Sequence, residues 1–338
     1  MLGPDPFLLK WRTMTKREYY RRLWAIFRAY RKRETVLPYL PIRLWIEPTS
    51  FCNLKCVMCP NKDLDRRDKG YMPLELFRKI IDEAAGFVHE ANLIHRGESL
   101  LHPDFFEMVR AASAAGIVTK LHTNATLLDE DKARKLIEAG LHQLTFSFDG
   151  YDKATYESIR VNGTFEKTIE NIRGFHRVRK ELGAKKPRTI LELINFPDLY
   201  RNVGRKEKKA FLETFKEFPP DRVRIKDMHN WAGEIGGPKK GRKYAPCTFL
   251  WASLIIFWDG RVLPCTQDFF GDLAVGDAGK STLAAIWNGD RMAELRKKAG
   301  AADIRGLTPC SACDRPWRNT FLGVPSEYVW KLLLRRMP

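Results

Sequence analysis

Three cysteines lie close together near residue 50, directly after a short apolar segment. The stretch IEPTSFCNLKCVMCPN, residues 46–61, places Cys52, Cys56 and Cys59 in a Cys-x3-Cys-x2-Cys pattern. Three thiolates on one tight loop can bind three irons of a four-iron cluster and leave the fourth iron without a protein ligand. Structural zinc prefers four ligands, often in Cys-x2-Cys pairs, so the wider gap fits zinc poorly. The motif favours a catalytic cluster over its alternatives, a zinc site or buried structural thiols.

This motif, with Met58 before its last cysteine, resembles the signature of the radical S-adenosylmethionine (SAM) superfamily. The resemblance implies a 4Fe–4S cluster whose open iron chelates the amino and carboxylate groups of SAM. The reduced cluster would then cleave SAM to a 5′-deoxyadenosyl radical that abstracts a hydrogen atom. An external one-electron reductant, such as flavodoxin or ferredoxin, is therefore expected as a partner.

Strand patterns and helix patterns alternate after Pro41, and helix-boundary residues such as Pro73 and Asp129 separate them. Such alternation predicts an α/β fold with parallel strands and right-handed crossovers. Six units predict a partial (β/α)6 barrel of the radical SAM type, with its chemistry on loops at the carboxyl ends of the strands. The expected strands are 42–47, 91–95, 117–122, 142–148, 188–194 and 222–227.

The loops after the later strands also resemble the superfamily. The segment HRGES, residues 95–99, resembles the Gly-Gly-Glu-Pro segment that holds the SAM amino group, although Arg96 and Ser99 depart from it. The segment SFDG, residues 147–150, resembles a Ser-x-Asp-Gly turn. Ordinary turn chemistry is the alternative for each, since Asn, Asp and Gly serve turns anyway. The residues expected to bind the cofactor are Met58, Gly97, Glu98, Ser99, Asn124, Ser147, Asp149 and Arg160.

Four further cysteines, Cys247, Cys265, Cys310 and Cys313, occupy the C-terminal third of the chain. The first two flank a hairpin expected to turn at Asp259-Gly260, and a helix is expected over 282–298. This part resembles the SPASM and Twitch extensions of radical SAM enzymes. The resemblance implies one auxiliary 4Fe–4S cluster with four cysteine ligands, and a zinc ribbon-like site is the alternative.

The chain has 338 residues and a formal net charge of +18, with ten basic residues and one acidic residue between Lys10 and Arg33. That segment predicts a basic helix, which caps a domain or touches an anionic membrane. The positive field favours an anionic substrate, and nucleic acid is not an expected partner. No apolar run reaches membrane-span length, and the N-terminus does not resemble a signal peptide, so a cytoplasmic location is expected.

We expect four segments along the chain. They are a basic N-terminal helix at 1–40, the partial barrel at 41–233, the SPASM/Twitch-like auxiliary cluster domain at 234–320 and a C-terminal helix at 321–338.

All seven cysteines are used by this division into three and four, so none is left to donate a hydrogen atom to a substrate radical. The resemblance to Twitch enzymes then favours an oxidoreductase that dehydrogenates an alcohol of a sugar-like or anionic small molecule. The auxiliary cluster would accept an electron. The alternatives are a peptide maturase that cross-links a ribosomal precursor, and a non-catalytic iron–sulfur or zinc protein that binds nucleic acid or membrane. Candidate catalytic bases are Glu47, His95 and His229.

The cysteine pattern predicts two four-iron clusters, hence about eight irons per chain. Replacing Cys52, Cys56 and Cys59 together with alanine should leave about four irons, as measured by metal analysis of anaerobically reconstituted protein. Zinc at the four C-terminal cysteines would contradict the auxiliary-cluster prediction.

Overall fold

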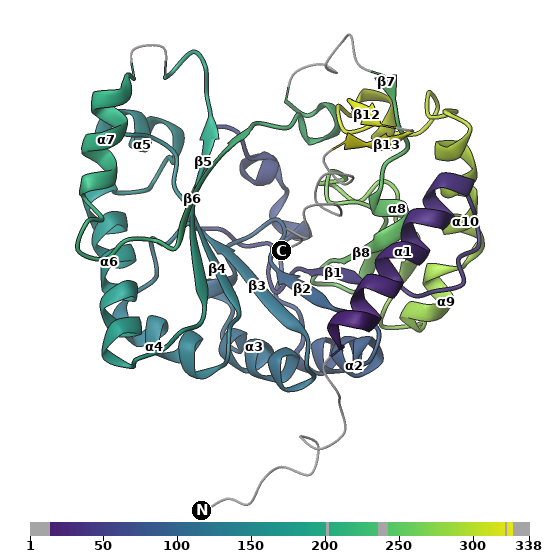
Figure 1. Ribbon diagram of the computed structural model, residues 1–338, viewed down its shortest axis with the longest axis horizontal. Helices are drawn as coiled ribbons and strands as arrows, with labels where there is room; N and C mark the ends of the chain where they lie inside the picture. Colours follow the sequence, from purple (N-terminus) through teal and green to yellow (C-terminus); the bar gives the residue numbers. More distant parts are fainter. Residues whose placement is uncertain (1–13, 201–202, 236–242, 322, 327–338) are drawn as a thin grey trace, which may run out of the picture. The chain divides into compact units, whose positions relative to one another are not determined.

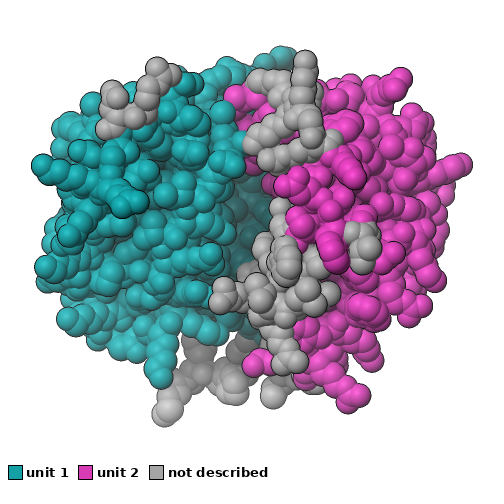
Figure 2. Space-filling model, turned by 45° about the horizontal axis from the view of Figure 1, so that its top comes forward, with its two compact units in different colours: residues 1–13, 44–228, 257–260 teal, residues 14–43, 229–256, 261–338 magenta. Residues whose placement is uncertain are grey.

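The computed structural model describes residues 14–200, 203–235, 243–321 and 323–326. The described chain divides into two compact units, coloured separately in Figure 2. The first unit contains residues 44–228 and 257–260, and the second contains 14–43, 229–256 and the chain from 261 onward.

The first unit is built on six strands in the order β1-β2-β3-β4-β5-β6 (Figure 1), and the pairs from β2 to β6 are parallel. The expected α/β fold is confirmed, and every expected strand end lies within two residues of the observed one. The strands are β1 (Arg43–Ile46), β2 (Glu90–Leu93), β3 (Val118–Thr123), β4 (Gln143–Ser147), β5 (Arg188–Asn195) and β6 (Arg222–Asp227).

Helices connect these strands, and α3, α4 and α6 lie along one side of them in Figure 1. The helix-boundary residues work as expected, since the carboxylate of Asp129 accepts a hydrogen bond of 2.8 Å from the backbone N–H of Lys132. The helices are α2 (Leu74–Ala84), α3 (Phe105–Ala114), α4 (Glu130–Glu138), α5 (Lys153–Ile159), α6 (Phe165–Glu181) and α7 (Arg205–Glu213). Short 3₁₀ turns are η2 (Pro60–Asp63), η3 (Arg66–Asp68) and η4 (Ser99–Leu101).

The two faces of this sheet differ in chemistry because successive side chains of a strand point to opposite faces. Leu121, Phe146 and Leu191 are fully buried on one face, where Phe146 packs edge-on against Phe175 of α6 with ring centroids 5.7 Å apart. The other face carries polar side chains from the same strands. The helices therefore cover the apolar face and leave the polar face uncovered.

The second unit contains the antiparallel strands β8, β9 and β10. The β8–β9 hairpin turns at Asp259-Gly260 as expected, and its turn residues 257–260 are assigned to the first unit. Its strands are β7 (Lys243–Tyr244), β8 (Ser253–Ile256), β9 (Arg261–Leu263), β10 (Gly276–Asp277), β11 (Trp317–Arg318), β12 (Thr320–Phe321) and β13 (Val324–Pro325). Its helices are α1 (Lys16–Lys32), α8 (Phe249–Ala252), α9 (Leu283–Trp287) and α10 (Asp290–Gly300), with 3₁₀ turns η5 (Trp231–Gly233) and η6 (Cys310–Ala312).

The basic helix α1 caps the second unit with one face. Tyr30 is buried there, donates a hydrogen bond of 2.9 Å to the carbonyl oxygen of Pro246 and lies edge-on to Trp251. Trp24 is exposed on another face and stacks on Phe27. The capping interpretation is thus supported. No helix of the described residues is long and apolar enough to cross a membrane.

One expectation about the C-terminal part was wrong, and a second was wrong at its start. The helix expected over 282–298 is broken into α9 and α10, because Asn288 leaves the helix to exchange hydrogen bonds with the backbone of Leu37 and Gly289 starts the next helix. The start of the expected helix at 321–338 belongs to the antiparallel pair β12–β13. Residues 327–338 lie outside the described residues.

Candidate active site

The cysteine loop follows β1, where its position in the sequence predicted it. Its backbone is paired with the end of α5, since the N–H groups of Lys55 and Val57 donate to the carbonyl oxygens of Val161 and Ile159 at 3.0 Å each. A further hydrogen bond of 3.1 Å from Cys59 N–H to the carbonyl of Cys56 closes a turn between two of the cysteines. The loop is therefore fixed along its length by backbone contacts.

The three thiols are close enough to interact electrostatically. Burial raises the pKa of Cys52 to about 12, and the charges of Glu98, Cys56 and Cys59 add to that rise. Burial likewise raises the pKa of Cys59 to about 11. Buried thiols of this kind ionise only when a metal or a cation neutralises them. The donor set therefore fits an iron–sulfur cluster held by these three residues.

One guanidinium group lies beside this loop. Nη1 of Arg160 lies 3.7 Å from Sγ of Cys56, and its Nε and Nη2 donate hydrogen bonds of 2.9 and 2.6 Å to one carboxylate oxygen of Asp149. The other oxygen of Asp149 accepts from the N–H of Ile194. Burial lowers the pKa of Arg160, but the charges of Asp149 and Cys56 outweigh it and raise that pKa. Asp149 thus orients Arg160 toward the cysteine loop, and Ser147 lies half-buried at the end of β4.

Gly97 lies directly beneath the start of the cysteine loop. A side-chain carbon at this position would lie 2.3 Å from the carbonyl oxygen of Thr49 and 2.4 Å from that of Phe51. The next residue, Glu98, donates its backbone N–H to Phe51 O at 2.8 Å. Only glycine permits this close approach of two backbone segments.

The carboxylate of Glu98 joins the loop after β2 to the end of β3. One oxygen accepts from the hydroxyl of Thr123 at 2.9 Å and the other from the N–H of Asn124 at 2.8 Å, and burial raises the pKa of Glu98. The amide of Asn124 in turn donates to Oδ1 of Asn53, next to the first cysteine, at 3.0 Å. The hydroxyl of Ser99 instead donates to a backbone carbonyl of β2. The structure thus brings Glu98 and Asn124 to the cysteine loop.

Glu47 forms a buried ion pair that the sequence did not reveal. Arg96 binds both carboxylate oxygens at 2.7 Å, the N–H of Trp258 donates at 3.3 Å, and Nδ1 of His95 lies 3.5 Å away. Burial would raise the pKa of Glu47, but the hydrogen bonds from Arg96 and His95 outweigh it and lower the pKa to about 2. Arg96, which departs from the family segment, therefore serves Glu47 and also lies over the Phe257 ring at 3.6 Å.

The other four cysteines lie together in the second unit. The hydrogen bond from Cys265 lowers the pKa of Cys247 to about 6 and raises that of Cys265, and burial raises the pKa of Cys310 and Cys313 to about 12. The mutual charge interactions of these thiols show that all four lie near one another. They fit a second multi-iron cluster.

Asn230 holds the loop that carries the last two cysteines. Its amide donates to the carbonyl of Ala312 at 2.8 Å and accepts from the N–H of Asp314 at 3.1 Å. The neighbouring candidate base His229 lies in this second unit and packs edge-on against Trp231. The sequence offered no signal for Asn230, because an isolated asparagine after a strand reads as a turn residue.

No group of three or more His, Cys, Asp or Glu side chains converges on a single metal ion in the described part of the chain. The Cys-x3-Cys-x2-Cys spacing of the first group fits zinc poorly.

Two family models match the chain. Residues 46–184 match the Radical SAM superfamily, and residues 247–314 match the SPASM iron–sulfur cluster-binding domain. These domains bind SAM and 4Fe–4S clusters, so the expected cofactors are confirmed.

Several similar proteins align with most of the chain. A tungsten-containing aldehyde ferredoxin oxidoreductase cofactor-modifying protein of Pyrococcus furiosus is 27% identical over 80% of this chain and 88% of its own length. A PqqA peptide cyclase of Gluconobacter oxydans is 24% identical over 84% of this chain and 85% of its own. The crystal structure of Streptococcus suis SuiB bound to precursor peptide SuiA has a TM-score of 0.62 at 15% identity, with 92% and 80% of the chains covered. At 15% identity, the likeness to the SuiB structure shows the fold alone.

Replacing Gly97 with alanine should displace the cysteine loop, because the added carbon meets two backbone carbonyl oxygens. We expect iron content to fall from about eight to about four atoms per chain, with the auxiliary cluster retained. Gly306→Ala is the matched control, since nothing lies within 4 Å of its added carbon. Equal iron content and equal SAM cleavage in the two variants would contradict the role given to Gly97.

Proposed function

Since the chain carries a radical SAM domain followed by a SPASM domain, we propose that it is an oxidoreductase that dehydrogenates an alcohol of an anionic, sugar-like small molecule. The observation that carries this proposal is the use of the seven cysteines. Three lie on the loop after β1 and four lie together in the second unit. No thiol is left over to return a hydrogen atom to a substrate radical, and loss of an electron to the auxiliary cluster is the route that the remaining four cysteines provide.

The seven cysteines form two sites, one for the SAM-binding cluster and one for the auxiliary cluster. Cys52, Cys56 and Cys59 would hold the first cluster, with SAM bound at its open iron. When bound, SAM and the clusters would supply a hydrogen-abstracting radical and an acceptor for one electron. Arg160 places positive charge beside Cys56, and the Glu98 carboxylate fixes the loops around the SAM site. We propose 41–233 as the limits of the partial barrel and 234–320 as those of the auxiliary cluster domain.

Oxidation of an alcohol to a carbonyl removes one hydrogen atom from carbon, one proton from oxygen and one electron. The proton requires a base. Glu47 is ionised but engaged by Arg96 and buried, which makes it the weakest of the three candidates. His95 and His229 are the stronger ones, because histidine is the side chain that most often serves as a general base.

Peptide maturation is the second candidate function. The PqqA peptide cyclase of Gluconobacter oxydans aligns with most of this chain, and its name assigns it a peptide substrate. A cross-link between two side chains also removes two hydrogen atoms, so loss of mass alone does not separate the two functions. We favour the small molecule because the four auxiliary cysteines suffice for one cluster only. We expect the enzyme to work in the cytoplasm with an external reductant.

The test is turnover of a small-molecule extract in deuterated water with SAM and a reductant, followed by mass spectrometry. We expect a product two hydrogen atoms lighter than its substrate, with one SAM consumed per product. Borodeuteride should add deuterium to this product, because a carbonyl is reducible and a cross-link is not. The variant Cys310→Ala/Cys313→Ala should still cleave SAM but form little product.

Two outcomes would contradict the proposal. A product of unchanged composition with one non-exchangeable deuterium would indicate epimerisation through another hydrogen donor. A lighter product that is a peptide and resists borodeuteride would indicate the maturase.

A further inference from the structure

The face of the sheet that the helices leave uncovered carries polar and charged side chains. The register pairs His122 of β3 with Thr145 of β4, and Glu192 of β5 with Arg224 of β6. Lys226 lies two residues beyond Arg224 on the same strand and hence on the same face. We call these five residues, His122, Thr145, Glu192, Arg224 and Lys226, the polar sheet face.

Glu192 binds two cations on this face. Its Oε1 lies 2.6 Å from Nζ of Lys226, its Oε2 pairs with Arg224, and its side chain is only 4% exposed. Nδ1 of His122 lies 4.0 Å from the same carboxylate. Burial would raise the pKa of Glu192, but Lys226, His122 and Arg224 outweigh it and lower that pKa. Glu192 is therefore ionised, and it orients both cations.

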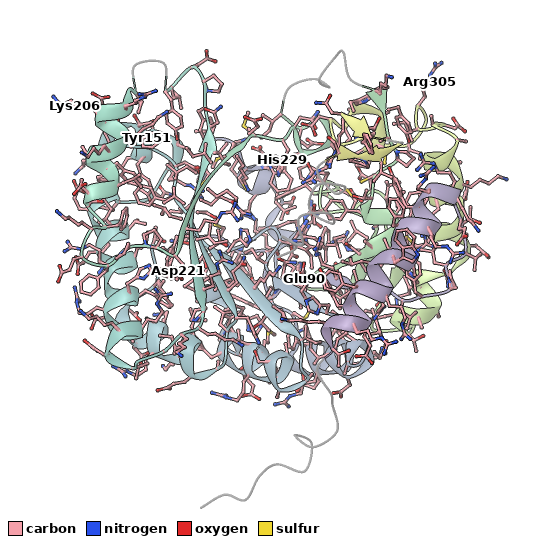
Figure 3. All side chains as sticks on the ribbon, viewed as in Figure 1. Glu90, Tyr151, Lys206, Asp221, His229 and Arg305 are labelled. Carbon is pink, nitrogen blue, oxygen red and sulfur yellow. The ribbon has the colours of Figure 1, made fainter. Side chains whose placement is uncertain are left out.

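The charges of the polar sheet face do not balance. One carboxylate faces two permanent cations, and burial lowers the pKa of His122 to about 4, so that imidazole adds no charge near pH 7. The adjacent strands contribute a pair that is neutral overall, Lys120 with Glu90, which is labelled in Figure 3. One positive charge is thus left over. The side chains of Arg224 and Lys226 are 36% and 42% exposed, so they remain open to a ligand.

Two polar atoms of this face also lack partners. Nε of Arg224 and the hydroxyl of Thr145 are buried, and neither forms a hydrogen bond among the described residues. Unsatisfied buried donors are rare in native proteins because each one sacrifices its hydration. A network that served stability alone would pair its charges and satisfy its donors. These atoms indicate that something else completes the face.

The polar sheet face adjoins the residues assigned to the SAM site. The carbonyl oxygen of Glu192 accepts from the N–H of Phe148 at 2.8 Å, and Asp149 accepts from the N–H of Ile194, two residues beyond Glu192. Asp149 in turn binds Arg160, which lies beside Cys56. A molecule on this face would therefore lie next to the site where the radical forms.

We propose that the polar sheet face binds an anionic group of the substrate, a carboxylate or a phosphate, through Arg224 and Lys226. Glu192 holds the two cations in place. This inference rests on the proposed function, since it takes the ligand to be the substrate. Arginine and lysine near the ligand are suited to both anions, because their hydrogen bonds to oxyanions are charge-assisted.

The test is titration calorimetry of the full chain with both clusters in place and SAM in excess, under anaerobic conditions without reductant. The probes are succinate for a carboxylate and inorganic pyrophosphate for a phosphate. We expect saturable binding of one equivalent of at least one probe, and the tighter one identifies the anion. Lys226→Met should weaken it by about tenfold or more, the effect of losing one charge-assisted hydrogen bond, and Lys226→Arg should restore most of it.

Lys216→Met is the matched control, because it removes the same charge from a side chain that is 82% exposed. It should bind the probe as the wild type does. Absence of saturable binding in the wild type, equal losses in Lys216→Met and Lys226→Met, or displacement of SAM by the probe would each overturn the proposal. Since no turnover is involved, this result does not depend on whether the product is dehydrogenated.

Discussion

The need to hold three thiols, one buried and two half-buried, on one short loop governs the first unit. Burial disfavours their ionised form, as the raised pKa values of Cys52 and Cys59 show, so cluster assembly has to supply the compensating charge. The protein contributes a fixed backbone from two directions. Gly97 lets the loop after β2 approach the cysteine loop, and Arg160 brings a guanidinium group to Cys56 from the far end of α5. The strands and helices of the first unit hold these segments beside the cysteine loop.

The two faces of the sheet differ in role, since one packs against the helices and the other carries charged side chains. Fully buried side chains such as Phe146 and Leu191 fill the face beneath the helices, and charged ones such as Glu192 and Lys226 occupy the other. Ends of the same strands supply the loops of the SAM site, as parallel α/β folds commonly do. In Figure 3, Tyr151 after β4 and Asp221 before β6 mark the two ends of these strands. One sheet can therefore present cofactor and substrate groups side by side.

Much of this arrangement follows from the sequence alone. Strand positions and cysteine motifs are local patterns, and they predicted the sheet, the hairpin at Asp259-Gly260 and both cysteine groups. The ion pair of Glu47 with Arg96 could not be predicted, since it joins loops after different strands. The break at Asn288 could have been predicted, because Asn288-Gly289 is a turn signal in the sequence, and the hydrogen bond to Leu37 adds to it in the structure. Tertiary contacts of this kind leave no periodicity in the sequence.

The central claim is that the loop after β1 holds a cluster with one iron open to SAM. The most direct measurement is electron paramagnetic resonance of the reduced protein before and after addition of SAM, with 5′-deoxyadenosine quantified in the same sample. Binding at an open iron should change the g values of one cluster while the signal of the other stays as it was, and 5′-deoxyadenosine should form. Spectra that SAM leaves unchanged, with no 5′-deoxyadenosine, would contradict the account.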